Sequence, residues 1–144
     1  MSTPIKKTAS AVWKGDLKAG KGTVSTESGA LAAQPYGFNT RFEGKAGTNP
    51  EELLGAAHAS CFSMALSMIL GSDNLTPDSI ETTAAVSLEK VEGGFAITAI
   101  HLTTVAKIPG ADQARFDAAA QKAKEGCPVS KVLNAKITLD AKLA

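Results

Sequence analysis

The chain has 144 residues, enough for one domain of ordinary size with its own hydrophobic core. Apolar residues make up 44% of it and charged residues 20%, which excludes a disordered tail or a fibrous protein. The 15 Lys and Arg and 14 Asp and Glu residues leave a net charge of +1, which argues against a general nucleic-acid binder. Two cysteines are too few for a disulfide-stapled secreted scaffold, and the first thirty residues hold no apolar segment of a signal peptide. We therefore expect a cytoplasmic protein with a single domain over residues 1–144.

The first part of the chain is expected to form short strands. Apolar residues alternate over residues 9–13, the period-2 pattern of a half-buried strand. Residues 23–26 are rich in β-branched side chains and predict a second strand. Residues 36–43 alternate as well, with three aromatic side chains on one face and Arg41 among polar residues on the other. This pattern predicts a third strand.

A long apolar helix follows. Residues 48–52 read as its start, because Thr48 or Asn49 can cap it, Pro50 suits the first turn, and Glu51 or Glu52 can complete a capping box. The 18 residues from 53 to 70 carry no charged side chain, and a glycine follows at position 71. A helix that is apolar nearly all round is expected to be buried on every side.

A membrane span is the competing interpretation of residues 53–70. This run is at the short limit of the ~17–25 residues of a spanning helix, and it contains His58 and three serines. The rest of the chain would also lose its core, so we expect no membrane. Because a lone chain of this size can hardly bury such a helix on all sides, we expect a dimer.

The remaining segments complete the predicted fold. Alternating residues at 84–89 and 95–102 flank a hairpin turn at 92–94, and the alternation changes parity near Ala99, which indicates a bulge or a strand buried on both faces. A helix is expected at 112–124, a short helix from 126–128 onward, and a last strand at 137–141. The order predicts an α+β fold, with antiparallel sheets covering a central helix.

The two cysteines each have two interpretations. Cys61 lies in the middle of the apolar helix, where it is either a core residue or a functional thiol. Cys127 lies at or next to a helix N-terminus, where it is either a small capping residue or a thiol whose ionised form the helix dipole favours. The pair would be redox-active if the fold brought the two thiols together. A zinc site is disfavoured, because Cys61, His101 and Cys127 lack the usual ligand spacing.

Two further side chains could act on Cys61. His58 is at i−3 on the same helix face and could form a Cys–His dyad, or it could make a local polar contact. Burial raises the pKa of a thiol, so an ionised Cys61 needs a nearby cation. Of the two arginines, Arg115 lies in a polar helix start, which leaves Arg41 as the better candidate unless it is only a surface residue.

Three motifs make the chain resemble the OsmC/Ohr family: YGFNTRF at 36–42, TNPEELLGAAHASCF at 48–62 and GCPVS at 126–130. The similarity covers essentially the whole chain, including GTVSTESG at 22–29. It implies a thiol-dependent peroxidase that prefers organic hydroperoxides to hydrogen peroxide and serves in stress defence. It also implies an intertwined homodimer with active sites at the subunit interface. The family name speaks of osmotic stress, but nothing in these residues senses osmolarity.

The resemblance also assigns roles to residues. Cys61 would be the peroxidatic cysteine, which becomes a sulfenic acid, and Cys127 the resolving cysteine, which condenses with it to a disulfide. Arg41 and Glu51 would be the polar pair that orients and activates the thiolate. A dithiol, of lipoyl type or on a lipoylated protein, would reopen the disulfide. No metal, haem or flavin is implied.

The position of Glu51 bears on the dimer. Glu51 and Cys61 lie ten residues apart on one helix, about 15 Å along the axis at ~1.5 Å per residue. A glutamate side chain does not span that distance, so a two-fold partner would have to supply one of the two residues.

Two other functions remain open at this stage. A cysteine hydrolase or transferase built on His58 and Cys61 would act on esters or amides and give Cys127 no role. A non-catalytic dimeric protein that binds an apolar ligand would make both cysteines structural.

Overall fold

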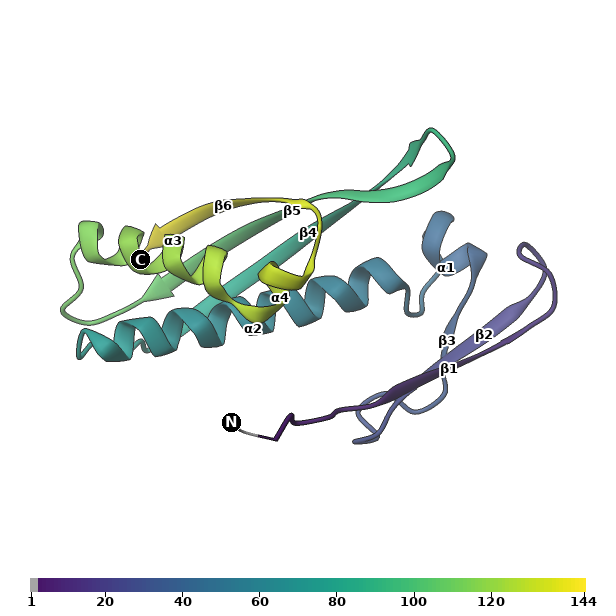
Figure 1. Ribbon diagram of the computed structural model, residues 1–144, viewed down its shortest axis with the longest axis horizontal. Helices are drawn as coiled ribbons and strands as arrows, with labels where there is room; N and C mark the ends of the chain where they lie inside the picture. The colour runs from purple at the N-terminus through teal and green to yellow at the C-terminus, as the bar shows by residue number, and fades with distance from the viewer. Residues whose placement is uncertain (1–2) are drawn as a thin grey trace. The chain divides into compact units, whose positions relative to one another are not determined.

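The computed structural model describes residues 3–144 and divides the chain into two compact units, Met1–Pro50 and Glu51–Ala144. In the N-terminal unit, three strands form an antiparallel sheet in the order β1-β2-β3 (Figure 1). They are β1 (Ala9–Lys14), β2 (Lys21–Thr26) and β3 (Gln34–Tyr36), and a single-turn helix, α1 (Phe38–Phe42), follows them. The first two strands agree with the sequence prediction. However, β1 is exposed along its whole length, so the expected half-buried strand at 9–13 is wrong.

A glycine allows the aromatic side chains of this small sheet to pack. Gly22 pairs with Trp13 on one side and with Tyr36 on the other. The two rings lie 5.5 Å apart between centroids. A Cβ atom at position 22 would lie 2.4 Å from the Tyr36 ring and 2.7 Å from the Trp13 ring, closer than packed atoms approach. The aromatic contact therefore depends on the absence of a side chain at this position.

The predicted strand over residues 36–43 is wrong, because the chain turns at Gly37. The Thr40 hydroxyl accepts a hydrogen bond from the Gly37 N–H (2.9 Å) and donates one to the Gly37 carbonyl (3.0 Å). Such side-chain bonds to the local backbone compete with strand pairing. The helical turn then places the guanidinium carbon of Arg41 5.5 Å from the centre of the Phe42 ring. Arg41 is thus an aromatic neighbour and does not lie on an opposite, polar strand face.

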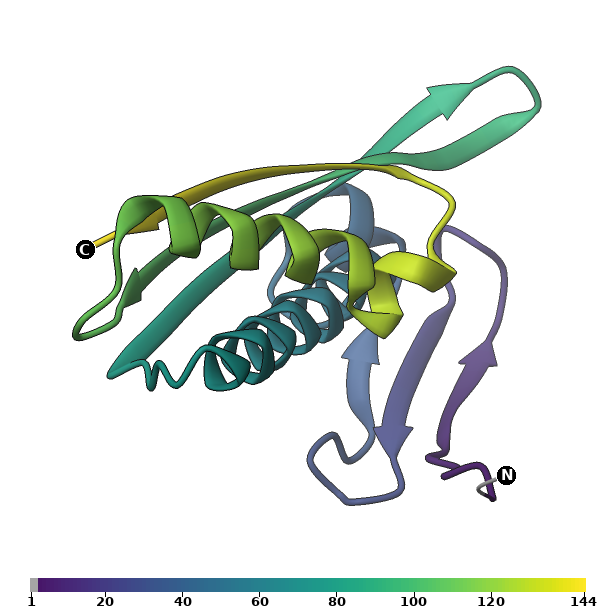
Figure 2. The same ribbon diagram turned by 60° about the vertical axis from the view of Figure 1, so that its left-hand side comes forward.

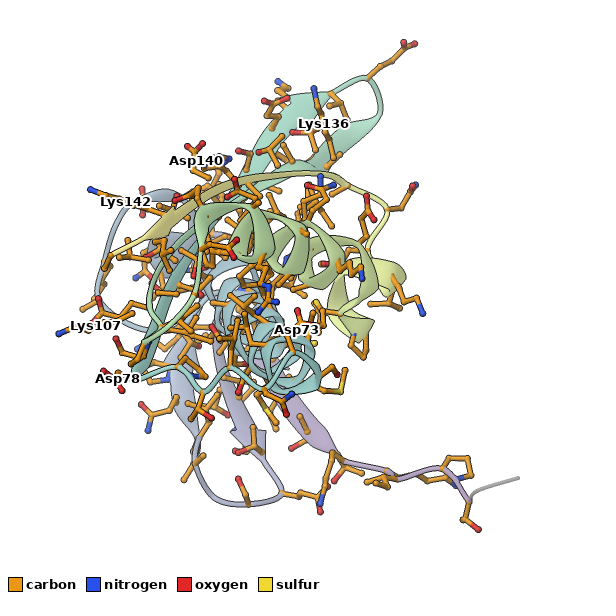
Figure 3. The ribbon with its side chains drawn as sticks, turned by 90° about the vertical axis from the view of Figure 1, so that its left-hand side faces the viewer. Asp73, Asp78, Lys107, Lys136, Asp140 and Lys142 are labelled. Atoms are coloured by element: carbon orange, nitrogen blue, oxygen red, sulfur yellow. The ribbon has the colours of Figure 1, made fainter. Side chains whose placement is uncertain are left out.

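The C-terminal unit consists of a three-stranded sheet and the helices on one of its faces. Its elements are α2 (Pro50–Ser72), β4 (Ser79–Val91), β5 (Gly94–Lys107), α3 (Gln113–Gly126), α4 (Pro128–Val132) and β6 (Lys136–Leu143). Helices α2 and α3 lie on the same side of the β4-β5-β6 sheet (Figure 2). The other side carries charged side chains such as Lys136, Asp140 and Lys142 of β6, which point away from the helices (Figure 3).

The strands of this unit confirm the predicted hairpin and bulge and correct the predicted sheet. Ser87 pairs with Ala99 but Leu88 pairs with Ile97, so β5 carries Thr98 as an extra residue. This extra residue explains the change of parity near Ala99. Strand β6 pairs with β5 in parallel, not antiparallel as expected. The chain reaches β6 through α3 and α4, and a crossover of this kind returns a strand in the parallel direction. The fold class is α+β, as predicted.

Helix α3 behaves as its sequence predicts. Asp112 caps it by accepting a hydrogen bond from the Arg115 N–H at 2.8 Å. The residues of its apolar face are buried in the core that it shares with the sheet and α2: Phe116, Ala119, Ala120 and Ala123.

Helix α2 has the predicted extent but not the predicted burial. Only one stripe of it is buried, made up of Glu51, Gly55, His58, Phe62, Leu66 and Leu70. On the other side Met64 is 76% exposed and Met68 is 70% exposed, so burial on every side is wrong for the single chain. The helix is long and apolar enough to cross a membrane by length and composition. Phe62, Leu66 and Leu70 of its buried stripe, however, belong to the same core as the sheet and α3.

Candidate active site

The fold of the C-terminal unit brings the two cysteines together, although they lie 66 positions apart in the sequence. Cys61 is half-buried in the middle of α2, and Cys127 is fully buried at the N-cap of α4. Both are free thiols. The Cys61 sulfur interacts with the Cys127 thiol and with the backbone N–H of Val129 in the first turn of α4. The condition for a redox-active pair, which the sequence left open, is therefore met.

The surroundings of Cys61 act on its ionisation in opposite directions. Burial raises the pKa of the Cys61 thiol. The hydrogen bond from the Val129 N–H lowers this pKa, and the neighbouring Cys127 raises it through hydrogen bonding and charge repulsion. The net effect is a raised pKa, which favours the protonated thiol at neutral pH. A cation beside Cys61 would reverse this balance.

An apolar cavity opens beside Cys61. It measures about 600 Å³, within the range of sites for small organic ligands. The residues that line it come from α2, α3 and the start of α4: Ser60, Cys61, Met64, Ala65, Met68, Ile69, Lys122, Gly126 and Pro128. The peroxidatic candidate thus faces a space that suits the alkyl or aryl part of a substrate.

Hydrogen bonds join the buried side chains of Cys127, Ser130 and His58. The Ser130 hydroxyl is 3.2 Å from the Cys127 sulfur and 2.7 Å from Nε2 of His58. Cys127 and His58 are fully buried, and Ser130 is 7% exposed. The Cys127 sulfur also accepts the Ser130 N–H at 3.3 Å, which caps α4. Ser130 was not among the candidate residues predicted from the sequence. An N-cap side chain bonds the backbone N–H of the residue three positions later, so the predicted helix start at Cys127 was the signal for Ser130.

This geometry decides between the two interpretations of His58. Its Nε2 atom is paired with Ser130, and its Nδ1 atom is buried without a hydrogen-bond partner in the part of the chain that the structure describes. Neither ring nitrogen bonds Cys61, so the predicted His58–Cys61 dyad is not formed; the polar contact that His58 makes is with a residue 72 positions away in the sequence, not a local one. Burial lowers the pKa of His58, which favours the neutral imidazole.

Arg41 belongs to the N-terminal unit. It is exposed, and it helps to line a cavity of about 190 Å³ in that unit. The other lining residues are mainly aromatic or apolar: Trp13, Leu17, Tyr36, Gly37, Phe38, Phe42 and Pro50. A guanidinium beside aromatic rings is a site that can hold an anion or a polar head next to an apolar group.

Glu51 lies in the first turn of α2 and is 9% exposed. Helix α2 is continuous from Pro50 to Ser72, so Glu51 and Cys61 of one chain are about 15 Å apart along the axis at ~1.5 Å per residue. The structure therefore does not bring Glu51 to the thiol of its own chain through this helix.

Within residues 3–144, no three His, Cys, Asp or Glu side chains are grouped so that they could hold a metal ion. His101, the second histidine, lies on the sheet. It contacts Thr138 at 2.6 Å and Asp140 at 3.1 Å, away from the helix side that carries the thiols.

Comparison with known proteins identifies the family of this chain. The family model described as "OsmC-like protein" matches residues 42–142. The chain belongs to the OsmC-like protein family. It is 66% identical over 139 residues to "Peroxiredoxin OsmC" of Escherichia coli (strain K12), which covers 96% of this chain and 97% of that protein. It is 30% identical to "Organic hydroperoxide resistance protein OhrB" of Bacillus subtilis (strain 168), over 85% of this chain and 88% of that one.

Solved structures of OsmC-like proteins share the fold. The crystal structure of OhrB of Bacillus subtilis superposes with a TM-score of 0.67 at 30% identity, over 95% of this chain and 98% of that chain. An OsmC-like protein of unknown function from Vibrio cholerae gives a TM-score of 0.75 at 15% identity, over 96% of this chain and 99% of that chain. The second comparison supports the fold alone. Both the OsmC and the organic hydroperoxide resistance branches are therefore represented among relatives of this chain, as the sequence motifs predicted.

Proposed function

We propose that this OsmC-like thiol peroxidase reduces organic hydroperoxides through Cys61 and Cys127. The Cys61 thiolate attacks one peroxide oxygen, the O–O bond breaks, and the alcohol leaves while Cys61 becomes a sulfenic acid. The Cys127 sulfur then displaces the hydroxyl group of that acid, which gives a Cys61–Cys127 disulfide and water. An external dithiol returns both residues to thiols. The protein thereby serves peroxide defence.

One observation carries this proposal: two free cysteines from distant parts of the sequence meet inside one folded unit. A hydrolase would not need Cys127, and its His58–Cys61 dyad is not formed in this structure. The apolar cavity at Cys61 favours an alkyl or aryl hydroperoxide over hydrogen peroxide, because burial of the organic group adds to binding. The names of the relatives from Bacillus subtilis point to the same substrate class.

Arg41 and Glu51 are proposed to form the pair that activates the thiolate. Because the pKa of Cys61 is raised, its thiol needs a nearby cation to ionise at neutral pH. A carboxylate can hold a guanidinium in a bidentate arrangement. Because Glu51 and Cys61 of one chain are about 15 Å apart on α2 at ~1.5 Å per residue, we assign this pair to Cys61 of the partner subunit. The exposed Met64 and Met68 of α2 would be covered in such a homodimer.

The remaining assignments follow from this chemistry. A vicinal dithiol of lipoyl type, free or on a lipoylated protein, is the proposed reductant. Its second thiol resolves the mixed disulfide with the protein by forming a disulfide within the reductant. No resident cofactor or metal is assigned to the cycle. The two free thiols suit a reducing cytoplasm. We keep a single functional domain over residues 1–144, since the residues assigned to the reaction come from both units.

The experiment is a thiol count. The reduced protein is treated with one equivalent of cumene hydroperoxide, and free thiols are titrated after denaturation. We expect the loss of two thiols per chain with no cross-linked dimer. A hydrolase or a purely structural role for the cysteines predicts no loss of thiols. A loss of one thiol, or a disulfide between chains, would contradict the assignment of Cys127 as the resolving residue.

A further inference from the structure

His58 is a buried titratable side chain that the reaction described above does not use. The side chain is fully buried, and its Nδ1 atom has no hydrogen-bond partner among residues 3–144. A buried polar side chain is costly unless it is paired, and the pairing of His58 that the structure shows runs through Nε2. The other ring nitrogen is joined through one hydroxyl to the sulfur of Cys127.

We propose that Ser130 and His58 form a proton relay that activates Cys127 for closure of the disulfide. This inference rests on the proposed function, since it concerns the second step of that cycle. Ser130 touches the reacting sulfur and is therefore a catalytic residue. His58 acts through Ser130 and is a positioning residue that holds the proton at the end of the relay.

The distances allow two arrangements that differ by one shift of protons. In the first, the Cys127 S–H donates to Ser130 Oγ, and the Ser130 O–H donates to Nε2 of His58. In the second, the Nε2–H of His58 donates to Ser130 Oγ, and the Ser130 O–H donates to the Cys127 thiolate. In both arrangements the Cys127–Ser130 contact and the Ser130–His58 contact each have one donor and one acceptor. The relay thus moves a proton without breaking the buried network.

The step balances in atoms and charge. The proton of Cys127 passes to Ser130 while the Ser130 proton passes to His58. The lone pair of the Cys127 sulfur forms the S–S bond to Cys61, and the S–O bond of the sulfenic acid breaks. The hydroxide that leaves takes up a proton to become water, and His58 then gives up the proton that it held. The sum is one thiol and one sulfenic acid converted to one disulfide and one water.

Burial gives His58 the properties that a relay needs. The lowered pKa of His58 keeps the imidazole neutral at rest, so that Nε2 can accept a proton. Because the ring is buried, the charged form is costly and passes its proton on. The Cys127 side chain is fully buried as well. The relay offers it an acceptor inside the fold.

The experiment measures the second step alone. Reduced protein is mixed with one equivalent of cumene hydroperoxide without reductant, quenched at intervals under denaturing conditions, and analysed by mass spectrometry for Cys61 sulfenic acid and disulfide. We expect His58→Gln and Ser130→Ala to slow the conversion of sulfenic acid to disulfide by about 100-fold, the lower end of what a positioned acid–base group contributes. The double variant should be no slower than either single variant, because both remove the same step.

Two comparisons separate a relay from a structural role. Ser130→Thr keeps the hydroxyl and should recover most of the rate that Ser130→Ala loses. His101→Gln removes the other histidine, which also contacts a hydroxyl but lies on the sheet, and should close its disulfide at the parent rate. The parent protein should show a solvent deuterium isotope effect on disulfide closure, and this effect should be lost in His58→Gln.

Each outcome bears on the proposal. Closure at the parent rate in folded His58→Gln overturns the relay and leaves the proposed function intact. A parent protein whose closure is insensitive to deuterium overturns the relay even if the variants do not fold. A parent protein that forms the sulfenic acid but no disulfide within the chain refutes the resolving role of Cys127, and the relay with it.

Discussion

The N-terminal unit, Met1–Pro50, contributes no side chain to the main apolar core of the described residues, whereas the C-terminal unit, Glu51–Ala144, holds all of that core. The C-terminal unit also brings Cys61 and Cys127 together by itself. The N-terminal unit relies on turns and on one aromatic contact, and its first strand is exposed throughout. The two thiols thus lie in the unit with the deep burial, while Arg41 belongs to the unit in which apolar side chains such as Val12 and Leu17 are exposed.

The largest effect is expected from the thiols of the C-terminal unit. Cys61→Ser should abolish peroxide consumption, because no sulfenic acid can form. Cys127→Ser should allow about one turnover and then stall, with Cys61 prone to overoxidation. Peroxide consumption driven by a dithiol measures both. Sustained turnover of Cys127→Ser at the parent rate would show that the buried pair is not a redox pair.

The next effect tests whether the N-terminal unit serves the thiol. Burial raises the pKa of Cys61, so the thiolate fraction and the rate of attack should increase as the pH rises. Arg41→Ala should shift the pH–rate curve to higher pH and slow attack at pH 7 by about tenfold for each pH unit of displacement. Arg41→Lys should be only partly active, since lysine lacks the planar fork.

The matched control for this prediction is the other arginine. Arg115→Ala alters an exposed residue of α3 paired with Asp112 and should leave the pH–rate curve unchanged. An unchanged curve in Arg41→Ala would mean that the thiol of Cys61 is activated without the N-terminal unit.

A third, smaller effect tests which subunit supplies Glu51 to each Cys61. Cys61→Ser and Glu51→Ala homodimers should be inactive or weak. When they are unfolded together and refolded, half of the dimers should be mixed, each with one site that combines Cys61 of one chain with Glu51 of the other. Activity should recover to roughly a quarter of the parent value. No recovery in verified mixed dimers would place the complete site within one chain.

The last prediction compares the packing of the two units. Phe116→Ala removes a fully buried ring from the C-terminal core and should lower the free energy of unfolding by about 3–5 kcal/mol. Val12→Ala alters a side chain of β1 that is 53% exposed. It should change the free energy of unfolding of the isolated chain by less than about 0.5 kcal/mol. Denaturant unfolding measures both. A larger loss for Val12→Ala that grows with protein concentration would show that a second copy covers β1.

Local sequence patterns predicted the elements that have local causes. The helix expected at 112–124 and the helix N-terminus expected at Cys127 both appear. The change of parity near Ala99 marked the extra residue at Thr98. The prediction failed at residues 36–43, where two hydrogen bonds between Thr40 and Gly37 turn the chain into α1. Alternation alone does not record such a side-chain bond.

The sequence by itself determined the family, the α+β class and the two cysteines, because motifs, periodicity and residue chemistry are properties of short segments. Only the tertiary structure decided that Cys61 and Cys127 meet, that β6 runs parallel to β5, and that His58 contacts Ser130 in place of Cys61. The two side-chain contacts depend on how α4 is placed against α2 after the crossover from the sheet. Such a contact joins residues more than sixty positions apart, and it is set by the packing of the whole core, which no local pattern encodes.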